Sequence, residues 1–251
     1  MNTSIRTAVL LVAGTGSRLR PLTDSVPKAL LPVGSETILI RLIRQLRECG
    51  ITRFVLATGY CEEAVREALL QQGVAAEYCR NENFSTTQNS VSLLNCAATL
   101  CAEPFIKLDG DLVLDVEILK RVLSEPSEMV VAVDSSRHLD QESMKTQIDG
   151  NGLVLDFGKS LPLSKSHAES IGVEKLDRNS GQVVLSRIAE LVSQGITDRY
   201  YEDVYAELIQ SVKLTAKTVD IRGLSWTEVD TLEDLELARQ LVEQLPMNSP
   251  G

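Results

Sequence analysis

The N-terminal part of the chain places a glycine loop and two cations directly after an apolar run. Residues 7–12 read as a buried strand, and residues 13–17 (Ala-Gly-Thr-Gly-Ser) form a loop of small residues. Arg18 and Lys28 stand at fixed positions after this loop. Because glycine has no side chain, the backbone N–H groups of such a loop can approach an anion closely. The pattern therefore predicts a site for a polyphosphate.

The spacing within this loop argues against two other phosphate-binding motifs. A Walker A loop requires Gly-x-x-x-x-Gly-Lys-Ser/Thr, and Gly14 is not followed by Gly-Lys at that distance. A dinucleotide fingerprint requires a third glycine for close helix–strand packing, but Gly16 is followed by Ser17, Arg18 and Leu19. The short Gly-Thr-Gly motif alone also fits an ordinary strand-to-helix turn, and that alternative stays open at this point.

The longer pattern of residues 11–28 is much more specific than the glycine motif. It resembles the signature of the sugar nucleotidyltransferase superfamily, in which a nucleoside triphosphate is joined to a phosphorylated acceptor with loss of pyrophosphate. The matching positions are Ala13, Gly14, Gly16, Arg18, Leu19, Pro21, Leu22, Thr23, Pro27 and Lys28. The resemblance extends over about residues 7–242.

The two cations have a clear use in such a reaction. In-line attack on the α-phosphate gathers negative charge on the phosphoryl oxygens and on the leaving pyrophosphate, and fixed cations stabilise that charge. We assign Arg18 to the β- and γ-phosphates and Lys28 to the α-phosphate and the acceptor phosphate, both as catalytic residues. The alternative is that both are ordinary surface residues.

Two acidic segments are candidates for a Mg²⁺ site. Asp109 and Asp111 flank a glycine at the end of an apolar run, and Asp230 follows in the segment Glu228-Val229-Asp230-Thr231. Magnesium prefers oxygen ligands, usually one or two carboxylates together with substrate phosphates. The resemblance implies Asp111 and Asp230 as the metal ligands. Alternatively, the first segment is a turn and Asp230 caps the following helix.

The segment 80–93 indicates which branch of the superfamily the chain resembles. Asn89-Ser90-Val91-Ser92-Leu93 is similar to bacterial phosphocholine cytidylyltransferases and to related inositol-phosphate and aminoethylphosphonate enzymes. The Asn89 amide offers a donor and an acceptor to a base edge, or it caps the following helix. The predicted nucleotide-binding residues are Leu11, Ala13, Gly14, Gly16, Ser17, Arg18, Lys28, Asn89, Ser90 and Asp109.

Three later segments are expected to hold the acceptor. Residues 168–175 (Ala-Glu-Ser-Ile-Gly-Val-Glu-Lys) and 200–205 (Tyr-Tyr-Glu-Asp-Val-Tyr) resemble segments of the same branch. Aromatic rings beside carboxylates suit an amine or quaternary ammonium head. Alternatively, the tyrosines pack in the core and the acidic residues stand at the start of a helix, where they interact favourably with its dipole. Lys159 resembles the acceptor-phosphate lysine of the family, or it is an exposed hairpin lysine. The predicted acceptor-binding residues are Lys159, Glu169, Ser170, Tyr201, Glu202, Asp203 and Trp226; Lys159 is also counted as catalytic.

Composition limits the partners. The 251 residues carry a formal net charge of −10, which argues against a general nucleic-acid binder because that role needs a basic surface. The 5 cysteines contain no Cys-x-x-Cys pair, and only 2 histidines are present, so a zinc site and a disulfide framework are not expected. No signal-peptide layout or membrane-length apolar run is evident, and we expect a cytoplasmic location.

Strand and helix patterns alternate along the chain. Strands are expected at 7–12, 54–59, 75–78, 105–108, 129–133 and 217–221, and helices at 37–49, 62–72, 90–100, 181–194, 201–212 and 231–244. Residues 146–155 read as a hairpin with the turn Asp-Gly-Asn-Gly. The alternation predicts an α/β fold with a doubly wound, Rossmann-like, mainly parallel but mixed sheet, whose ligands lie at the carboxyl ends of the strands.

We expect one nucleotidyltransferase domain over residues 1–245. Its NTP-binding half covers about 1–125 and its acceptor-binding half about 126–245, and residues 246–251 form a flexible tail. The predicted function is a magnesium-dependent cytidylyltransferase that uses CTP and a phosphorylated or phosphonate amino alcohol, such as phosphocholine or 2-aminoethylphosphonate. A sugar-1-phosphate or inositol-phosphate nucleotidyltransferase and a catalytically silent nucleotide-binding regulator stay open as alternatives, and a homodimer is left open.

Overall fold

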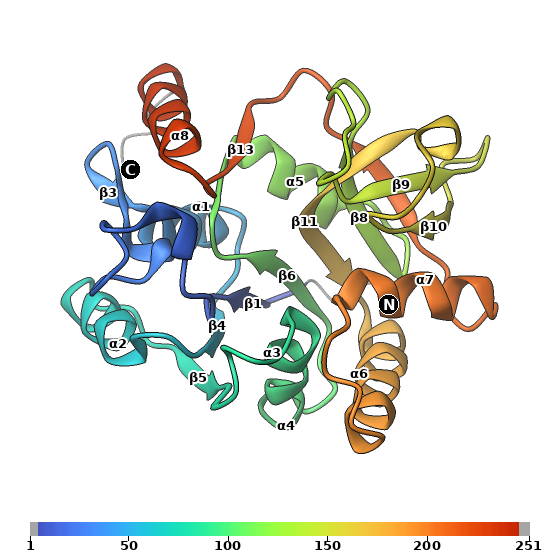
Figure 1. The fold of residues 1–251 in the computed structure, drawn as a ribbon, viewed down its shortest axis with the longest axis horizontal. Coiled ribbons are helices and arrows are strands. Elements are labelled where there is room, and N and C mark those ends of the chain that lie inside the picture. Colours follow the sequence, from blue (N-terminus) through green and yellow to red (C-terminus); the bar gives the residue numbers. More distant parts are fainter. Residues whose placement is uncertain (1–4, 246–251) are drawn as a thin grey trace.

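A mixed β-sheet forms the centre of the molecule. The computed structural model describes residues 5–245 of the chain. Within them, 9 strands form the main sheet in the order β10-β9-β11-β6-β1-β4-β5, and β8 and β12 extend it from β11. The pairs β1–β4, β1–β6, β4–β5 and β8–β12 are parallel, whereas β11 is antiparallel to its neighbours β6, β8 and β9. The predicted fold class is confirmed (Figure 1).

The element bounds are as follows. The strands are β1 (Thr7–Leu11), β2 (Pro32–Val33), β3 (Glu36–Thr37), β4 (Arg53–Thr58), β5 (Glu77–Arg80), β6 (Phe105–Asp109), β7 (Leu112–Leu114), β8 (Met129–Asp134), β9 (Lys145–Ile148), β10 (Val154–Phe157), β11 (Ala168–Leu176), β12 (Lys217–Asp220) and β13 (Trp226–Glu228). The helices are α1 (Ile38–Glu48), α2 (Glu62–Gln71), α3 (Asn89–Asn95), α4 (Ala97–Leu100), α5 (Val116–Ser124), α6 (Arg178–Ser193), α7 (Tyr201–Gln210) and α8 (Leu232–Gln244). Short 3-10 helices span Ser17–Leu19, Lys28–Leu30 and Leu163–Lys165.

The apolar run of β1 is explained by helices on both faces of the sheet. Side chains alternate along a strand, so Ala8 and Leu10 join one hydrophobic core, while Val9 joins the other. The first core also contains residues of α1, α2, α5 and α8, and the second contains residues of α3, α4, α6 and α7. A strand buried on both faces reads as a continuous apolar run.

Some expected elements differ from the observed ones. The single helix expected at 90–100 is divided into α3 and α4 at Cys96. The third strand covers Glu77–Arg80, slightly later than expected. Residues 168–175, interpreted only as a possible acceptor segment, lie in strand β11. The polar residues of this strand gave no strand pattern, although it is buried between β6, β8 and β9. The expected tail at 246–251 lies outside the described residues.

The hairpin prediction is confirmed. Strands β9 and β10 pair antiparallel, and the Asp149 carboxylate accepts hydrogen bonds from the N–H groups of Asn151 and Leu153 within the turn. Gly152 takes a positive φ of 77°, as such turns require. Among residues 5–245, no helix is long and apolar enough to cross a membrane.

The sheet brings functional segments to one edge. Strands β1, β6 and β8 run in the same direction, so the glycine loop, the Asp109–Asp111 turn and the segment after Asp134 all follow carboxyl ends. Strand β11 runs the other way and therefore begins at this edge, with Glu169 opposite Asp134. This is the edge at which ligands bind in open α/β sheets.

Candidate active site

A cavity of about 330 Å³ lies at this carboxyl edge. Its wall includes Arg18, which follows the glycine loop, Glu169 and Ser170 of β11, and Glu202 in the first turn of α7. Acidic residues outnumber cations in the wall. The acids are Asp109, Asp140, Glu142, Glu169, Glu202, Glu228 and Asp230, and the cations are Arg18, Arg137 and Lys159, with His138 as a further polar residue.

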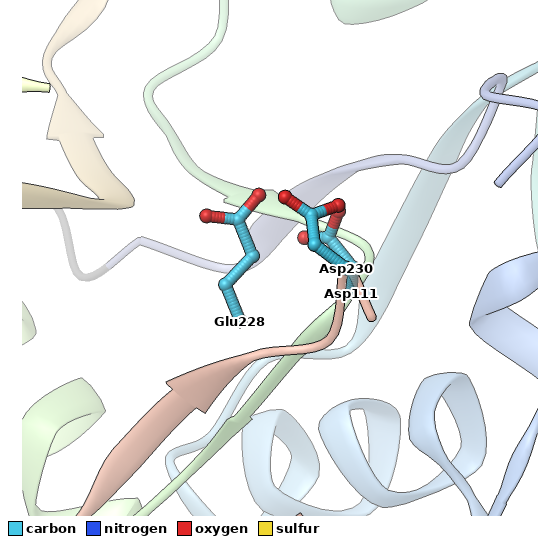
Figure 2. Close-up of side chains that lie close together, drawn as sticks. All are labelled: Asp111, Glu228 and Asp230. Carbon is cyan, nitrogen blue, oxygen red and sulfur yellow. The ribbon is translucent and has the colours of Figure 1, made fainter. Parts of the chain in front are cut away.

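Three carboxylates gather at one end of the cavity. Asp111, Glu228 and Asp230 each place an oxygen within 4.8 Å of the others (Figure 2). Strand β13 pairs antiparallel with β7, and the Val229 N–H donates to the Asp111 carbonyl at 3.0 Å. This backbone pairing holds the late acidic segment against the Asp111 turn.

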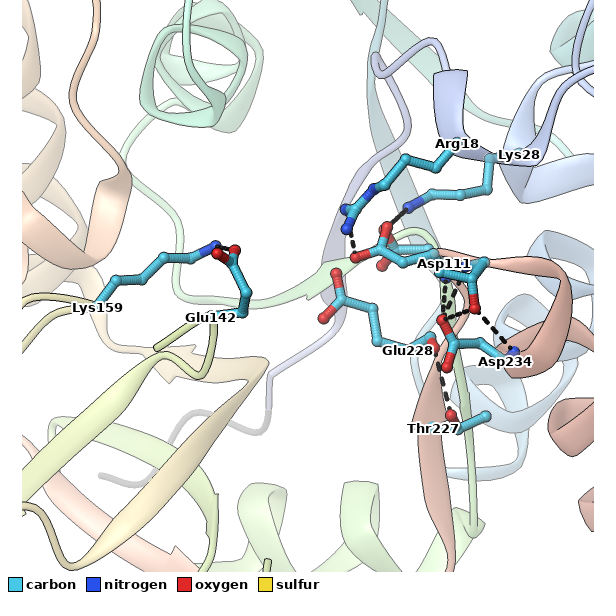
Figure 3. A network of polar contacts seen from close by, with 10 residues as sticks. Arg18, Lys28, Asp111, Glu142, Lys159, Thr227, Glu228 and Asp234 are labelled. Atoms are coloured by element: carbon cyan, nitrogen blue, oxygen red, sulfur yellow. Dashed lines mark hydrogen bonds and ion pairs between the residues drawn. The ribbon is translucent and has the colours of Figure 1, made fainter. Parts of the chain in front are cut away.

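Two cations compensate this acidic cluster. Lys28 Nζ lies 2.6 Å from Asp111 Oδ2 and 2.7 Å from Asp230 Oδ1, and Arg18 Nη2 lies 2.7 Å from Asp230 Oδ2 (Figure 3). Burial by itself would lower the pKa of Lys28, but the two carboxylates outweigh burial and raise it. The nearby charge of Asp111, together with burial, raises the pKa of Glu228 to about 9.

The glycine loop packs closely against Thr23 and Lys28. Gly16 has a φ of 60°, and its carbonyl accepts a hydrogen bond from Thr23 Oγ1 at 2.7 Å. A Cβ at Gly16 would lie 3.0 Å from the Cβ of Lys28 and 3.1 Å from a methyl of Thr23. The left-handed conformation and the close approach both favour glycine here.

A buried ionic network lies beneath the cavity. Lys107, which is fully buried on β6, lies 2.7 Å from Glu174 and 3.2 Å from Asp109, and its ammonium lies 3.5 Å from the centre of the Tyr201 ring. The Tyr201 hydroxyl donates to Asp109 Oδ2 at 2.7 Å. Gly172, with a φ of 75°, allows this arrangement, because a Cβ there would lie 2.4 Å from the same oxygen.

Glu202 is an incompletely partnered acid in the cavity wall. Its residue is 5% exposed, and among the described residues its Oε2 has no hydrogen-bond partner. Burial is the largest cause that raises the pKa of Glu202, to about 8, and the carboxylates of Asp109 and Glu174 raise it further. A buried carboxylate without a partner is costly for the fold and is typical of a functional site.

Comparison with known proteins identifies the family. Residues 8–197 match the model of the MobA-like NTP transferase domain. The chain belongs to this family. A solved structure described as the inositol-1-phosphate CTP transferase from T. maritima superposes with a TM-score of 0.80 at 22% identity, covering 98% of this chain and 100% of that one. That likeness shows a shared fold.

The curated relatives of this chain include a protein named as a cytidylyltransferase and one named as a CMP-phosphonate synthase. CTP:phosphoglutamine cytidylyltransferase of Campylobacter jejuni is 26% identical over 252 residues, covering 92% of this chain and 98% of that protein. CMP-5'-(3-aminopropyl)phosphonate synthase of Streptomyces rubellomurinus is 28% identical over 232 residues, which are 89% of this chain but 36% of the synthase. The chain thus spans nearly all of one relative and about a third of the other.

The structure brings many of the sequence-predicted residues of this chain to one cavity. Those in its wall are Arg18, Asn89, Asp109, Lys159, Glu169, Ser170, Glu202 and Asp230. Lys28 and Asp111 join them through the ion pairs with Asp230 and with each other. Lys159 lies across from Arg18 and Lys28, with Nζ 3.5 Å from Glu142 (Figure 3). The cavity wall does not include the other predicted residues of this segment, which are Leu11, Ala13, Gly14, Gly16 and Ser17.

Four predicted residues lie elsewhere. Tyr201 is fully buried below the cavity, and Trp226 packs in the hydrophobic core with its indole N–H donating to Asp134 at 2.8 Å. Asp203 accepts a hydrogen bond from the Tyr200 N–H at 3.0 Å, so it caps α7. Ser90 is buried and donates to the Arg199 carbonyl at 2.6 Å. On α7, helical periodicity places consecutive residues on different faces, which separates the side chains of Tyr201 and Asp203 from that of Glu202.

Asn89 has a role that neither alternative anticipated. Its Oδ1 accepts a hydrogen bond from the Tyr201 N–H at 3.0 Å, so it satisfies the first turn of α7 rather than of its own helix. The sequence patterns did not single out Glu228 or Arg137. Glu228 ends β13 and stands two positions before Asp230, and this spacing was the available signal, because residues two apart in an extended segment share a face.

Proposed function

We propose that this protein is a magnesium-dependent cytidylyltransferase. It would join CTP to a small phosphorylated or phosphonate acceptor with an amine head, such as phosphocholine or 2-aminoethylphosphonate, and release pyrophosphate. The observation that carries the proposal is the bridge of Lys28 between Asp111 and Asp230, with Arg18 on the other oxygen of Asp230. In this arrangement cations that could contact a triphosphate lie directly beside carboxylates that could hold a metal ion.

The reaction requires charge stabilisation more than proton transfer. An acceptor oxygen attacks the α-phosphorus of CTP and forms a new P–O bond, while the bond between the α-phosphorus and the bridging oxygen breaks and pyrophosphate leaves with the electron pair. The acceptor oxygen is already anionic near neutral pH, so no general base is needed. In this proposal Lys28 neutralises the α-phosphoryl oxygens and Arg18 the leaving pyrophosphate.

The acidic cluster fits a divalent cation with oxygen ligands. Asp111 Oδ1 is buried and has no hydrogen-bond partner among residues 5–245, and Glu228 and Asp230 offer further oxygens nearby. Asp111 and Asp230 would hold Mg²⁺, with Glu228 as a third oxygen donor. When bound, the ion would polarise phosphoryl oxygens and neutralise their charge.

Two features support the choice of CTP and of an amine-headed acceptor. The Campylobacter relative is named for CTP, and the Asn89 side chain still offers its NH₂ group to a base carbonyl after its oxygen is used by Tyr201. On the acceptor side, the buried Glu202 and the half-buried Glu169 present carboxylates to the cavity. A bound ammonium group would pair with Glu202 and stabilise its ionised form, which burial disfavours.

The test is pyrophosphate release. Purified protein with magnesium would be offered each of CTP, UTP, GTP and dTTP with phosphocholine, 2-aminoethylphosphonate, phosphoethanolamine, inositol phosphate and sugar-1-phosphates. We expect turnover with CTP and an amine-headed acceptor, and loss of turnover in Asp111→Asn and with a chelator. Turnover only with a sugar-1-phosphate would overturn the acceptor assignment. Nucleotide binding without turnover, unaffected by Asp111→Ala, would favour a silent regulator.

A further inference from the structure

The cavity holds a guanidinium that the sequence patterns did not single out. Arg137 follows β8 and lines the same cavity as Arg18 and Asp230. The other cations of the wall are engaged by acids of the wall, Arg18 by Asp230 and Lys159 by Glu142. Within residues 5–245, Arg137 forms its nearest ion pair at 3.9 Å, with Asp134, which is buried and outside the cavity wall.

Contacts behind Arg137 hold its guanidinium in a defined position. The group lies 4.5 Å from the centre of the Trp226 ring, and Nη2–H donates to the Trp226 carbonyl at 2.8 Å. The indole N–H donates in turn to Asp134 Oδ2 at 2.8 Å, while Asp134 Oδ1 accepts from the Ser136 N–H at 2.8 Å. Among the described residues, the bond to the Trp226 carbonyl uses one of the five N–H donors of the Arg137 guanidinium. The remaining donors can serve a ligand.

The position of Arg137 relative to the acidic cluster follows from β13. Trp226 and Glu228 are two residues apart on this strand, so their side chains share a face at a spacing of about 7 Å. Arg137 follows β8, lies over the Trp226 ring and lines the cavity together with Glu228 and Asp230. Arg18 and Lys28 approach the same cluster from the loop after β1.

We propose that Arg137 binds the phosphate or phosphonate group of the acceptor, and that Trp226 and Asp134 position it. This inference rests on the proposed nucleotidyl transfer. In that reaction the attacking and leaving oxygens lie roughly in line on opposite sides of the α-phosphorus. With the leaving pyrophosphate on the side of Arg18, the acceptor oxygens belong on the side of Arg137. The planar fork of arginine matches two oxygens of one phosphoryl group.

The chemistry of the acceptor group follows from this contact. One oxygen of the phosphate monoester or phosphonate attacks the α-phosphorus, pyrophosphate leaves with the electron pair, and Arg137 retains the other oxygens. In a wall rich in carboxylates, a fixed guanidinium prevents the acceptor's anionic group from being repelled. It would also orient the acceptor so that its other end faces Glu202.

The test compares acceptor and nucleotide kinetics in four variants. Arg137→Ala is expected to raise the acceptor KM about 10- to 100-fold, because a charge-assisted hydrogen bond is lost, and to leave the CTP KM within about threefold. Arg137→Lys should restore only part of this loss, because an ammonium lacks the fork. Trp226→Phe keeps a ring but removes the bond to Asp134, and should raise the acceptor KM less than Arg137→Ala.

The matched control is Arg222→Ala. Arg222 lies at the same edge and donates to Ser135 Oγ at 2.6 Å, but it is outside the cavity wall, so its variant should keep both KM values. An unchanged acceptor KM in Arg137→Ala, or a rise in the CTP KM alone, would overturn the inference.

A binding measurement separates this inference from the proposed function. If the wild type releases no pyrophosphate with any acceptor, the proposed function fails, and methylphosphonate binding followed by ³¹P NMR then decides about Arg137. Binding that Arg137→Ala weakens at least about tenfold, while Arg222→Ala does not, supports the inference. Equal binding to the wild type and Arg137→Ala, or no binding to the wild type, overturns it.

Discussion

Lys28→Met removes the ammonium group that joins the two predicted metal ligands. In the wild type Nζ lies 2.6 Å from Asp111 and 2.7 Å from Asp230, and the side chain is only 15% exposed. Such preorganised groups are worth about 10²–10³ in rate, or roughly 2.7–4 kcal/mol of transition-state stabilisation. We expect kcat to fall by about that factor and the CTP KM to rise by less than about tenfold, because Arg18 remains.

The same substitution also affects the fold. It leaves Asp111 and Asp230 without their shared cation, but these side chains are 16% and 26% exposed, so solvent screening reduces the penalty. We expect a destabilisation of about 1–2 kcal/mol, which for a chain of this size lowers Tm by about 2–8 °C. The double variant with Asp111→Asn should recover stability without recovering turnover, because Asp230 keeps its ion pair with Arg18 and Asp111→Asn removes the carboxylate that has lost its cation.

Pyrophosphate release at saturating CTP and magnesium measures the rate, and thermal denaturation measures the stability. Lys120→Met is the matched control, because Lys120 is half exposed on α5 and pairs with Glu117 at 3.9 Å. A Lys28→Met protein that is folded at the assay temperature and keeps kcat within about threefold of the wild type would refute the reasoning. So would a loss of rate that Asp111→Asn restores together with stability.

Three other predictions follow from the described contacts. Glu202→Gln should raise the KM of an amine-headed acceptor about tenfold or more. It should also raise Tm more at pH 8–9 than at pH 5. The pKa of Glu202 is about 8 in the fold and 4.5 ordinarily, so the wild-type fold loses stability as the pH rises between these values, and the glutamine variant does not. Thermal denaturation across pH checks this, and a pH-independent Tm difference would contradict it. Gly110→Ala should destabilise the fold by more than about 2 kcal/mol, since the new Cβ would lie 2.6 Å from a backbone oxygen. In Gly14→Ala the new Cβ would meet nothing within 4 Å, so this variant should fold normally. Denaturant titration of both variants measures the difference in their stability. Asp203→Ala should lower stability by about 0.5–2 kcal/mol with unchanged acceptor KM, since Asp203 caps α7; a raised acceptor KM would place it in the acceptor site instead.

Local patterns were sufficient for most of the fold. The alternation of apolar strands with helical segments predicted the doubly wound sheet. A strand buried on both faces appears in the sequence as a short continuous apolar run, whereas a helix buried on one face repeats its apolar residues about every 3.6 positions. The hairpin at 146–155 was predictable from its turn residues alone. Strand β11 was not, because its polar residues, including Glu174, are buried by partners from other segments, such as Lys107.

The candidate site divides in the same way. The sequence by itself determined the glycine loop with Arg18 and Lys28, and the acid at the end of β6, because each depends on neighbours within a few residues. Only the tertiary structure brought Lys28 to Asp230, 202 positions later in the chain, through the pairing of β13 with β7. It also turned Asp203 and Tyr201 away from the cavity, buried Glu202 in its wall and stacked Arg137 on Trp226. The register of the strands and the rotation of α7 decide these contacts, and both are set by packing among distant segments, which no local spacing records.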